Sequence, residues 1–279
     1  MCNLLFYLVE LQLFIQEQNK SATKQIIFRY KYQMKYSVLF LFCFSLNLVF
    51  SQNYFQERYK SFDKRLFHFG FMLGTNTSDF TKYEKLDVYN KQYQFYNALY
   101  SLQAIKNNPT IGGQLGILTT LKLGTPLLKL RFMPTLSFEE RVLSYTFEKI
   151  TSFDTLIYLK DQRVNSTNLS FPFILMFRAK RLNNFTAYAL LGGSYSLDLQ
   201  SQEKSAQNYF DPFLKIRKND FQGQIGGGIE FFATYFKFAI ELKYSHGVKN
   251  ILIQEQTPFD RPIEKLYNKG WWISLIFEG

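Results

Sequence analysis

Two histidines, His68 and His246, are the side chains of this 279-residue chain best suited to general acid–base chemistry. Such a base needs a nucleophile or an acid within hydrogen-bond reach. Ser245 neighbours His246, but successive side chains of an extended strand point to opposite faces, so the two cannot act together. The sequence offers no pairing for catalysis, and we predict that the protein is not an enzyme and has no catalytic residues.

Metal and cofactor sites lack suitable residues as well. Both cysteines, Cys2 and Cys43, precede the cleavage point proposed below, so the mature chain would contain none. Two distant histidines without cysteines do not form a metal-ligand cluster. The glycine run 226–228 lies in a strand pattern and is not followed by a helix, which argues against a phosphate-binding loop. We predict no metal, no cofactor and no small-molecule substrate.

The formal net charge of +11 is spread along the chain. Lysines and arginines are scattered from Lys20 to Lys269, with aspartates and glutamates between them. Nucleic-acid-binding proteins gather their basic residues into a patch or stripe. The distribution indicates a mixed solvated surface, and we expect no nucleic-acid partner.

A targeting segment is predicted near the N-terminus. Met34 and Lys35 precede an apolar stretch, 38–50, which ends at Ser51 before polar residues, as in a secretory signal peptide. An apolar stretch of this length is too short to span a bilayer. We therefore expect residues 34–51 to be a signal peptide, 1–33 to be a mis-annotated upstream extension, and 52–65 to be a periplasmic segment. A long leader, or an interfacial helix over 4–15, is the alternative.

Beyond the leader, apolar and polar residues alternate with the period of a β-strand. Aromatic residues make up 19% of the chain and mean hydropathy is −0.16, which excludes a bundle of membrane helices. We expect an all-β fold over 66–279, an eight-stranded antiparallel up-and-down transmembrane barrel whose strands have about 9–11 residues each. The expected strands are 67–73, 111–123, 128–138, 169–177, 189–199, 221–231, 236–244 and 271–277.

The connections between these strands alternate in length. Those after the second, fourth and sixth strands are short, whereas 78–108, 147–164, 200–219 and 249–268 are long. Outer-membrane barrels have short periplasmic turns and long outer loops, so both chain ends are expected in the periplasm and the outer surface in contact with outer-membrane lipid. A soluble lipocalin-like barrel, with the apolar face inside, is the alternative.

Charged residues of the polar parity would then face the lumen. An eight-stranded barrel is just wide enough for its side chains to fill it, so we expect a salt-bridge network rather than a wide pore or ion pathway. In this topology His68 lies near the periplasmic rim and His246 near the outer rim, about 25 Å apart. The expected lumenal charges are Lys122, Lys129, Arg131, Arg178, Asp198, Glu230, Lys237, Glu241 and Lys243.

The last strand resembles the C-terminal assembly signal of outer-membrane proteins, with a polar residue, a glycine and spaced hydrophobic residues ending in Phe277. The whole region 66–277 also resembles the PorT/SprT family, outer-membrane barrels of the Bacteroidota type IX secretion and gliding apparatus. Leu-Ser-Phe-Pro at 169–172 and Arg-Leu-Asn-Asn at 181–184 are the more specific segments. Thr135 and Glu139 depart from the family pattern, which often has glycine there. The other similar stretches are 68–76, 113–124, 130–138, 166–173, 185–193, 236–244 and 263–267.

The resemblance implies a non-enzymatic part in exporting proteins with a C-terminal sorting domain, through contacts with other secretion-machinery proteins. The first long loop, 78–108, is rich in tyrosine, which suits protein recognition, and we place a partner there. A generic small barrel, such as an adhesin, a narrow porin or a surface-stability protein, is the alternative, and a lipid-modifying enzyme is disfavoured by the separated histidines. The tyrosines of that loop are Tyr83, Tyr89, Tyr93, Tyr96 and Tyr100.

Overall fold

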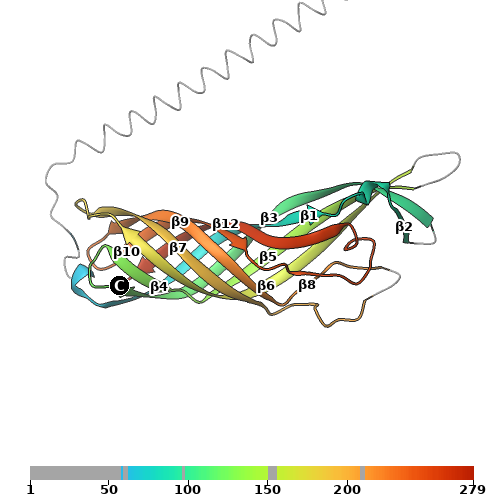
Figure 1. Ribbon diagram of the computed structural model, residues 1–279. Helices are drawn as coiled ribbons and strands as arrows, with labels where there is room; N and C mark the ends of the chain where they lie inside the picture. The colour runs from blue at the N-terminus through green and yellow to red at the C-terminus, as the bar shows by residue number, and fades with distance from the viewer. Residues whose placement is uncertain (1–57, 59–61, 96–97, 150–155, 208–210) are drawn as a thin grey trace, which may run out of the picture. The chain divides into compact units, whose positions relative to one another are not determined.

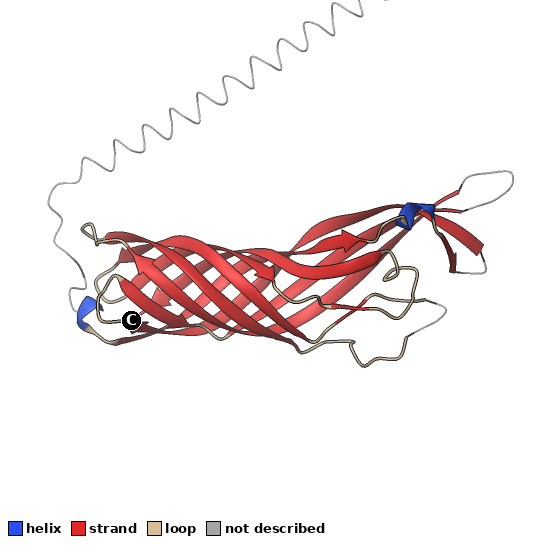
Figure 2. Ribbon diagram, in the orientation of Figure 1, coloured by secondary structure: helices blue, strands red, loops and turns tan. Residues whose placement is uncertain are grey.

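Alternating side chains give this protein a nearly all-strand structure. The computed structural model describes residue 58 and residues 62–95, 98–149, 156–207 and 211–279, in which strands dominate and two short 3-10 helices, η1 (Phe62–Lys64) and η2 (Val88–Asn90), are the helical elements (Figure 2). The expected upstream extension and signal peptide, 1–33 and 34–51, lie outside these residues. The long strands are β1 (Phe67–Glu84), β3 (Ala98–Lys122), β4 (Leu128–Phe132), β5 (Thr135–Lys149), β6 (Leu156–Arg178), β7 (Phe185–Asp198), β9 (Asn219–Phe232), β10 (Lys237–Gly247) and β12 (Ile263–Glu278).

The long strands close into an antiparallel barrel (Figure 1). Around the barrel they follow the order β1, β3, β4/β5, β6, β7, β9, β10, β12, and β12 pairs with β1 to complete the ring. β4 and β5 are two parts of one strand, since both pair with β3 and β6 and only Met133 and Pro134 separate them. Counted this way, the barrel has eight strands, and the predicted fold is confirmed.

The two faces of the barrel wall follow the predicted parity. Outward side chains such as Phe69, Ile117 and Leu191 are 65%, 68% and 56% exposed, while their neighbours His68, Leu118 and Leu190 are buried. The short connections are also confirmed. They comprise 123–127 with Gly124 at φ 71°, 179–184 with Asn183 at φ 54°, and 233–236. We call the end of the barrel formed by these turns, η1 and the C-terminus the base.

Several strands are much longer than the sequence predicted. β1, β3 and β6 have 18, 25 and 23 residues, so the first long connection shrinks from 78–108 to 85–97, which holds η2 and β2 (Gln92–Phe95). The predicted lengths were wrong because the outward apolar pattern ends at the membrane, whereas backbone pairing continues. In the extensions several outward positions are polar, for example Lys106 and Asp161, although Ile157 and Leu159 at the outer end of β6 are apolar.

Beyond the membrane-spanning part, the barrel wall opens into a second region. The pairing of β1 with β3 ends at Ser78 and Thr110. Beyond this point β1 stays paired with β12, whereas β3 stays paired with β5, which in turn pairs with β6. The small pair β8 (Lys215–Ile216) and β11 (Leu252–Ile253) also belongs to this region. We call the described residues within 79–110, 140–166, 199–218 and 248–269 the cap. In the described part of the chain, no helix is long and apolar enough to cross a membrane.

Candidate functional site: a filled lumen and a free strand edge

Charged side chains cross the lumen near the base. Arg131 on β4 donates through Nη1 to Glu241 Oε2 and through Nη2 to Glu278 Oε1, both at 2.8 Å. Lys237 on β10 pairs with Glu230 at 2.5 Å and also with Glu278. All five side chains are fully buried, and each of these three carboxylates has a cationic partner. Burying charges is tolerable only when they are paired in this way.

The layer continues to the wall and to the segment that precedes β1. Arg178 Nε donates to Glu230 Oε2 at 2.6 Å, and Arg178 Nη1 donates to Asp63 Oδ1 at 2.7 Å. Lys122 Nζ donates to the Asp63 carbonyl at 3.2 Å, which ties η1 to the end of β3. We give the name ion layer to the cations Lys129, Arg131, Arg178 and Lys237 together with the carboxylates Asp63, Glu230, Glu241 and Glu278.

Phe62 of η1 lies inside the base, beneath the ion layer. Its ring is fully buried and stacks on His68 at 3.8 Å between centroids, with Phe232 at 5.7 Å in an edge-on contact. The ammonium groups of Lys129 and Lys237 lie 4.8 and 4.9 Å from the ring centroid, within the range of cation–π attraction. Of the expected N-terminal segment 52–65, the last part therefore enters the barrel and closes its base.

The predicted salt-bridge network in the lumen is confirmed. Lys122 lies at the rim, and the other eight predicted lumenal charges are buried. Sequence reasoning missed Glu278 and Asp63, because the strand pattern was followed only to Phe277 and only from the start of β1. A signal for Glu278 was present, since it continues the inward parity of Ser274 and Ile276. Other buried charges that the sequence analysis missed are Glu139, Arg141, Lys215, Asp220 and Asp260.

Above the ion layer the lumen is lined by amides and hydroxyls. Gln114 donates to Ser274 Oγ at 3.0 Å, and Trp272 Nε1 donates to Ser245 Oγ at 2.7 Å. A polar cavity lined by Gln114, Trp272 and Lys243, among others, measures about 10 Å³, near the space that one water molecule needs. Side chains therefore fill this level of the barrel.

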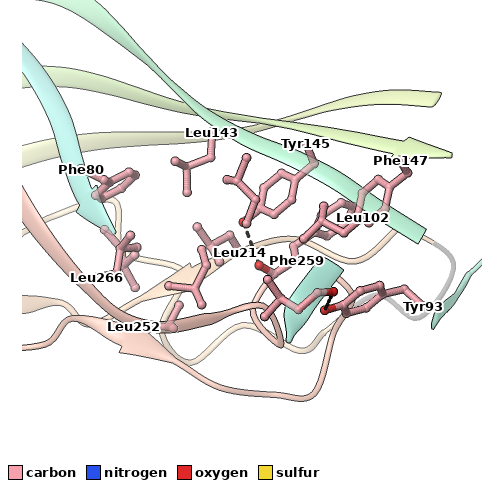
Figure 3. Packing of buried hydrophobic residues seen from close by; sticks show 14 of the residues in the cluster. Phe80, Tyr93, Leu102, Leu143, Tyr145, Phe147, Leu214, Leu252, Phe259 and Leu266 are labelled. Carbon is pink, nitrogen blue, oxygen red and sulfur yellow. Dashed lines mark hydrogen bonds between the residues drawn. The ribbon is translucent and has the colours of Figure 1, made fainter. Parts of the chain in front are cut away.

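The cap closes the opposite end with an apolar core. Figure 3 shows aromatic and leucine side chains from β1, β2, β3, β5, β11, β12 and the loops meeting there. Tyr145 Oη donates a hydrogen bond to the Phe259 carbonyl at 2.7 Å. This arrangement resembles the core of a soluble domain. The labelled residues of the core are Phe80, Tyr93, Leu102, Leu143, Tyr145, Phe147, Leu214, Leu252, Phe259 and Leu266.

The cap core changes the interpretation of the tyrosine-rich loop. Tyr93 and Tyr100 are 2% and 7% exposed and belong to the core, so they do not offer a recognition surface. Tyr83 and Tyr89 are exposed, and Tyr89 donates a hydrogen bond to Glu84. This hydrogen bond and one from Lys82 outweigh the effect of burial and lower the pKa of Glu84.

The two histidines lie at opposite ends of the barrel, as predicted. His68 faces the lumen at the base, whereas His246 is on the outer face near Tyr244 and Tyr267. His246 is paired with Lys269, which is paired with Asp79, eleven positions along β1 from His68. At 3.3 Å per residue this is about 36 Å along the strand. Ser245 points inward, away from His246, also as predicted.

Metal ligands do not gather in the part of the chain that the structure describes. Searched over those residues, His, Cys, Asp and Glu form no group of three or more suited to a metal ion.

β6 has a free edge in the cap. Its pairing with β5 runs from Leu156 to Ser170, but its pairing with β7 begins only at Asn168. Thr167 accepts a hydrogen bond from Leu199 N on the β7 side, and backbone groups alternate sides along a strand. The N–H and C=O groups of odd-numbered residues 157–165 therefore point to this side, where no strand is described. Their side chains face outward and are exposed. Residues 163–165 border a cavity with Gln200, Gln202 and Leu214, so the open part of the edge is its outer end.

The free edge has apolar side chains at its outer end. Ile157 and Leu159 are 70% and 69% exposed, and Leu156 is 54% exposed. The segment that contacts Gln162, through hydrogen bonds to Pro212 and Leu214, lies on the inner side of the strand because the Gln162 side chain is buried. Backbone groups that no described strand pairs, next to exposed apolar residues, form a template for another extended chain.

An antiparallel sheet closed on itself, apolar outside and filled inside, defines a transmembrane β-barrel. The model of the outer membrane protein β-barrel domain family matches residues 50–252, and the chain belongs to this family. It is thus an outer-membrane β-barrel protein of a Gram-negative bacterium.

Solved structures with a similar arrangement include the outer membrane protein OprG from Pseudomonas aeruginosa, at 13% identity and a TM-score of 0.38, over 76% of this chain and 93% of that one. LpxR from Salmonella typhimurium is similar at 7% identity and a TM-score of 0.26, over 73% of this chain and 99% of that one. No conclusion about function follows from either. Among curated proteins, none matches the sequence at a significant level.

Proposed function

We propose that this barrel is a non-enzymatic outer-membrane component of the type IX protein secretion machinery, and of gliding motility where the organism glides. It acts through protein contacts made by the cap, with β6 as the docking edge. Both chain ends lie in the periplasm and the cap lies outside the cell, since short turns are typical of the periplasmic side and long connections of the outer side.

The free edge of β6 is the observation that supports action through protein contacts. A sheet edge in a monomeric protein is usually blunted by charges, bulges or a covering loop. Here Ile157 and Leu159 leave the outer end of the edge apolar and exposed. An extended segment of a partner can add to the edge through backbone hydrogen bonds, and its alternate side chains can pack on these two residues.

The filled lumen also favours a function through contacts on the outer surface of the barrel. The ion layer and Phe62 occupy the base, a polar belt occupies the middle, and the cap core occupies the other end. A barrel of this kind offers no wide path for a solute, so its outer surfaces are left as the places where it can act.

The link to secretion comes from the sequence. The order of similar segments over 66–277, above all 169–172 and 181–184, resembles the PorT/SprT family, whose members belong to Bacteroidota. In the structure both of these segments lie in the membrane-spanning part or at the base, so they do not form the docking edge.

The proposal is tested by deleting the gene and complementing it with variants of the cap. Secretion of cargo with a C-terminal sorting domain is expected to stop on deletion and to return with the wild-type gene. Leu159→Lys, which puts a charge on the edge, is expected not to restore it. Leu86→Lys is the matched control, because Leu86 is a 90% exposed leucine of the cap on the β1 side.

Assembly of each variant is checked by heat-modifiable mobility, so that a folding defect is not mistaken for loss of docking. Intact secretion in the deletion strain would remove the secretion role and leave a generic small outer-membrane barrel. Full restoration by Leu159→Lys would remove the β6 edge as the contact site.

A further inference from the structure

A groove crosses the outer wall of the barrel just below the cap. It spans β6, β7 and β9, and its volume is about 660 Å³. Gly193 and Gly223 form its floor, and they are directly paired across β7 and β9. Phe173 pairs with Gly193 on the β6 side, so an aromatic side chain borders the floor.

Packing does not require glycine at either floor position. A Cβ built on Gly223 would meet no atom within 4 Å, and one on Gly193 would meet only the Gln222 carbonyl, at 3.8 Å. By contrast, a Cβ on the inward-facing Gly192 would come within 2.3 Å of the backbone oxygen of Phe173. The two floor glycines therefore leave space on the lipid-facing surface that larger side chains could fill without a clash.

The groove is lined mainly by apolar residues, and charged residues lie near one end of it in the chain. Tyr195 and Phe221, paired across the same two strands with ring centroids 4.9 Å apart, form the wall nearest the cap. Val248, which is 73% exposed and donates its N–H to the Phe221 carbonyl at 2.8 Å, closes one side. In the chain, Lys218 lies three residues before Phe221, and Lys249 directly follows Val248.

Three cations lie close in the chain to this end of the groove, within four residues of Phe221 or Val248. Arg217, Lys218 and Lys249 are exposed, and among the described residues none of them forms a salt bridge. Glu203 contacts this segment, but it accepts the backbone N–H of Lys218 rather than its ammonium group. Exposed positive charge without a carboxylate salt-bridge partner among the described residues therefore lies near this end of the groove.

We propose that the groove binds one acyl chain of a phosphorylated glycolipid of the lipid A type, with a phosphate group at Arg217, Lys218 and Lys249. The choice of lipid rests on the proposed orientation, which places this end of the groove, its rim, at the outer leaflet. An acyl chain that moves from the bilayer into the groove stays in an apolar environment, so it gains van der Waals packing but no hydrophobic transfer energy. Selectivity then comes from the shape of the groove together with the phosphate–cation attraction.

The test measures lipid bound to the purified full-length mature protein in detergent by native mass spectrometry. The probes are lipid A, dephosphorylated lipid A and phosphatidylglycerol. One variant, Gly193→Leu with Gly223→Leu, fills the floor. Its matched control is Gly113→Leu, because a Cβ on Gly113, in the wall of β3, also meets no atom within 4 Å.

A second variant removes the rim charges by Arg217→Ala, Lys218→Ala and Lys249→Ala. Its control removes three exposed lysines elsewhere on the cap, Lys91→Ala, Lys106→Ala and Lys265→Ala, so the net charge is the same. Heat-modifiable mobility verifies that all variants fold.

Lipid A is expected to bind the wild type and both controls alike. Affinity should fall about fivefold for each rim charge removed, and on the order of 100-fold for all three. The floor variant should also weaken binding, as should removal of the lipid phosphates. Equal binding of phosphatidylglycerol would overturn the choice of lipid, and undiminished binding by the floor or rim variant would overturn the site. This assay involves no secretion, so a failed secretion test does not affect it. If cysteine labelling showed that the cap faces the periplasm, the assignment of the lipid would be overturned.

Discussion

Replacing Glu278 by glutamine removes one negative charge from the ion layer and keeps the shape of the side chain. Glu278 is fully buried, pairs with Arg131 at 2.8 Å and with Lys237, and accepts a hydrogen bond from Thr120 Oγ1 at 3.1 Å. In the wild type the layer balances four cations against four carboxylates. The cations are Lys129, Arg131, Arg178 and Lys237, and the carboxylates are Asp63, Glu230, Glu241 and Glu278.

The variant leaves one positive charge without a buried counter-charge. Removing one partner of a buried ion pair typically costs about 3–5 kcal/mol. Glutamine still offers an acceptor oxygen to Arg131 or Thr120. We therefore expect the free energy of unfolding to fall by about 3 kcal/mol, near the lower end of this range. Glu264→Gln is the control on the same strand, since the Glu264 side chain is 54% exposed and lies 3.6 Å from Lys265. It should cost less than about 1 kcal/mol.

The free energy of unfolding can be measured by urea titration of the refolded barrel in detergent micelles. Both tryptophans of the protein, Trp271 and Trp272, lie in β12, so their fluorescence reports directly on the strand that contains Glu278. The double variant Glu278→Gln with Lys237→Met restores the charge balance. We expect it to be less destabilised than the sum of its single variants, because the two residues share the same network.

Equal losses for Glu278→Gln and Glu264→Gln would refute this reasoning. They would mean that water reaches the lumen near the base and screens the ion layer, as it screens pairs on the surface. The inference that the barrel is closed at its base would then fail with it.

Three further outcomes are expected. In planar-bilayer recordings the protein should show no large, stable conductance, because the ion layer and Phe62 fill the base; steady openings typical of a wide pore would contradict this. Phe277→Lys, or deletion of 270–279, should prevent assembly, since Phe277 stacks on Phe71 of the neighbouring strand with ring centroids 5.0 Å apart and a charge on the lipid face is costly. Unchanged heat-modifiable mobility of these variants would show that the last strand does not guide assembly. The hydrogen bonds to Glu84 lower its pKa below the ordinary 4.5, so its contribution to stability is complete above pH 4.5 and is lost as the pH falls through the folded-state pKa. Hydrogen exchange of the adjacent ends of β1 and β12, corrected for intrinsic rates, should rise on acidification in the wild type but not in Glu84→Gln; equal behaviour of the two would exclude this carboxylate as the cause.

The membrane-spanning part of the barrel could be predicted from sequence because side-chain direction in a strand is local. Once β10 is extended, the parity of Lys237, Glu241 and Lys243 opposite Ile240 and Leu242 determines which of them share a face. The same reasoning predicted eight strands, the short turns and most of the lumenal charges. Parity alone does not state which face is inside, and loop lengths were needed for that choice.

The strand extensions, the cap and the docking edge depend on contacts between residues far apart in the chain. Phe62 and Asp63 precede the first strand pattern, and only the folded barrel places them beside Lys129 and Arg178. Likewise, Tyr93 and Tyr100 belong to a segment whose tyrosine content is typical of a recognition loop, yet packing against Phe147 buries them.

The separation of His68 and His246 could already be predicted, because they belong to distant parts of the strand pattern. The sequence also determined the alternation that makes a barrel, because each strand residue faces one side or the other whatever lies beyond it. The tertiary structure alone decided how the two ends are closed, which edge of β6 stays free, and that Gly193 and Gly223 meet to form a groove. These features arise from the register between strands, and register is set by many long-range pairings rather than by any local segment.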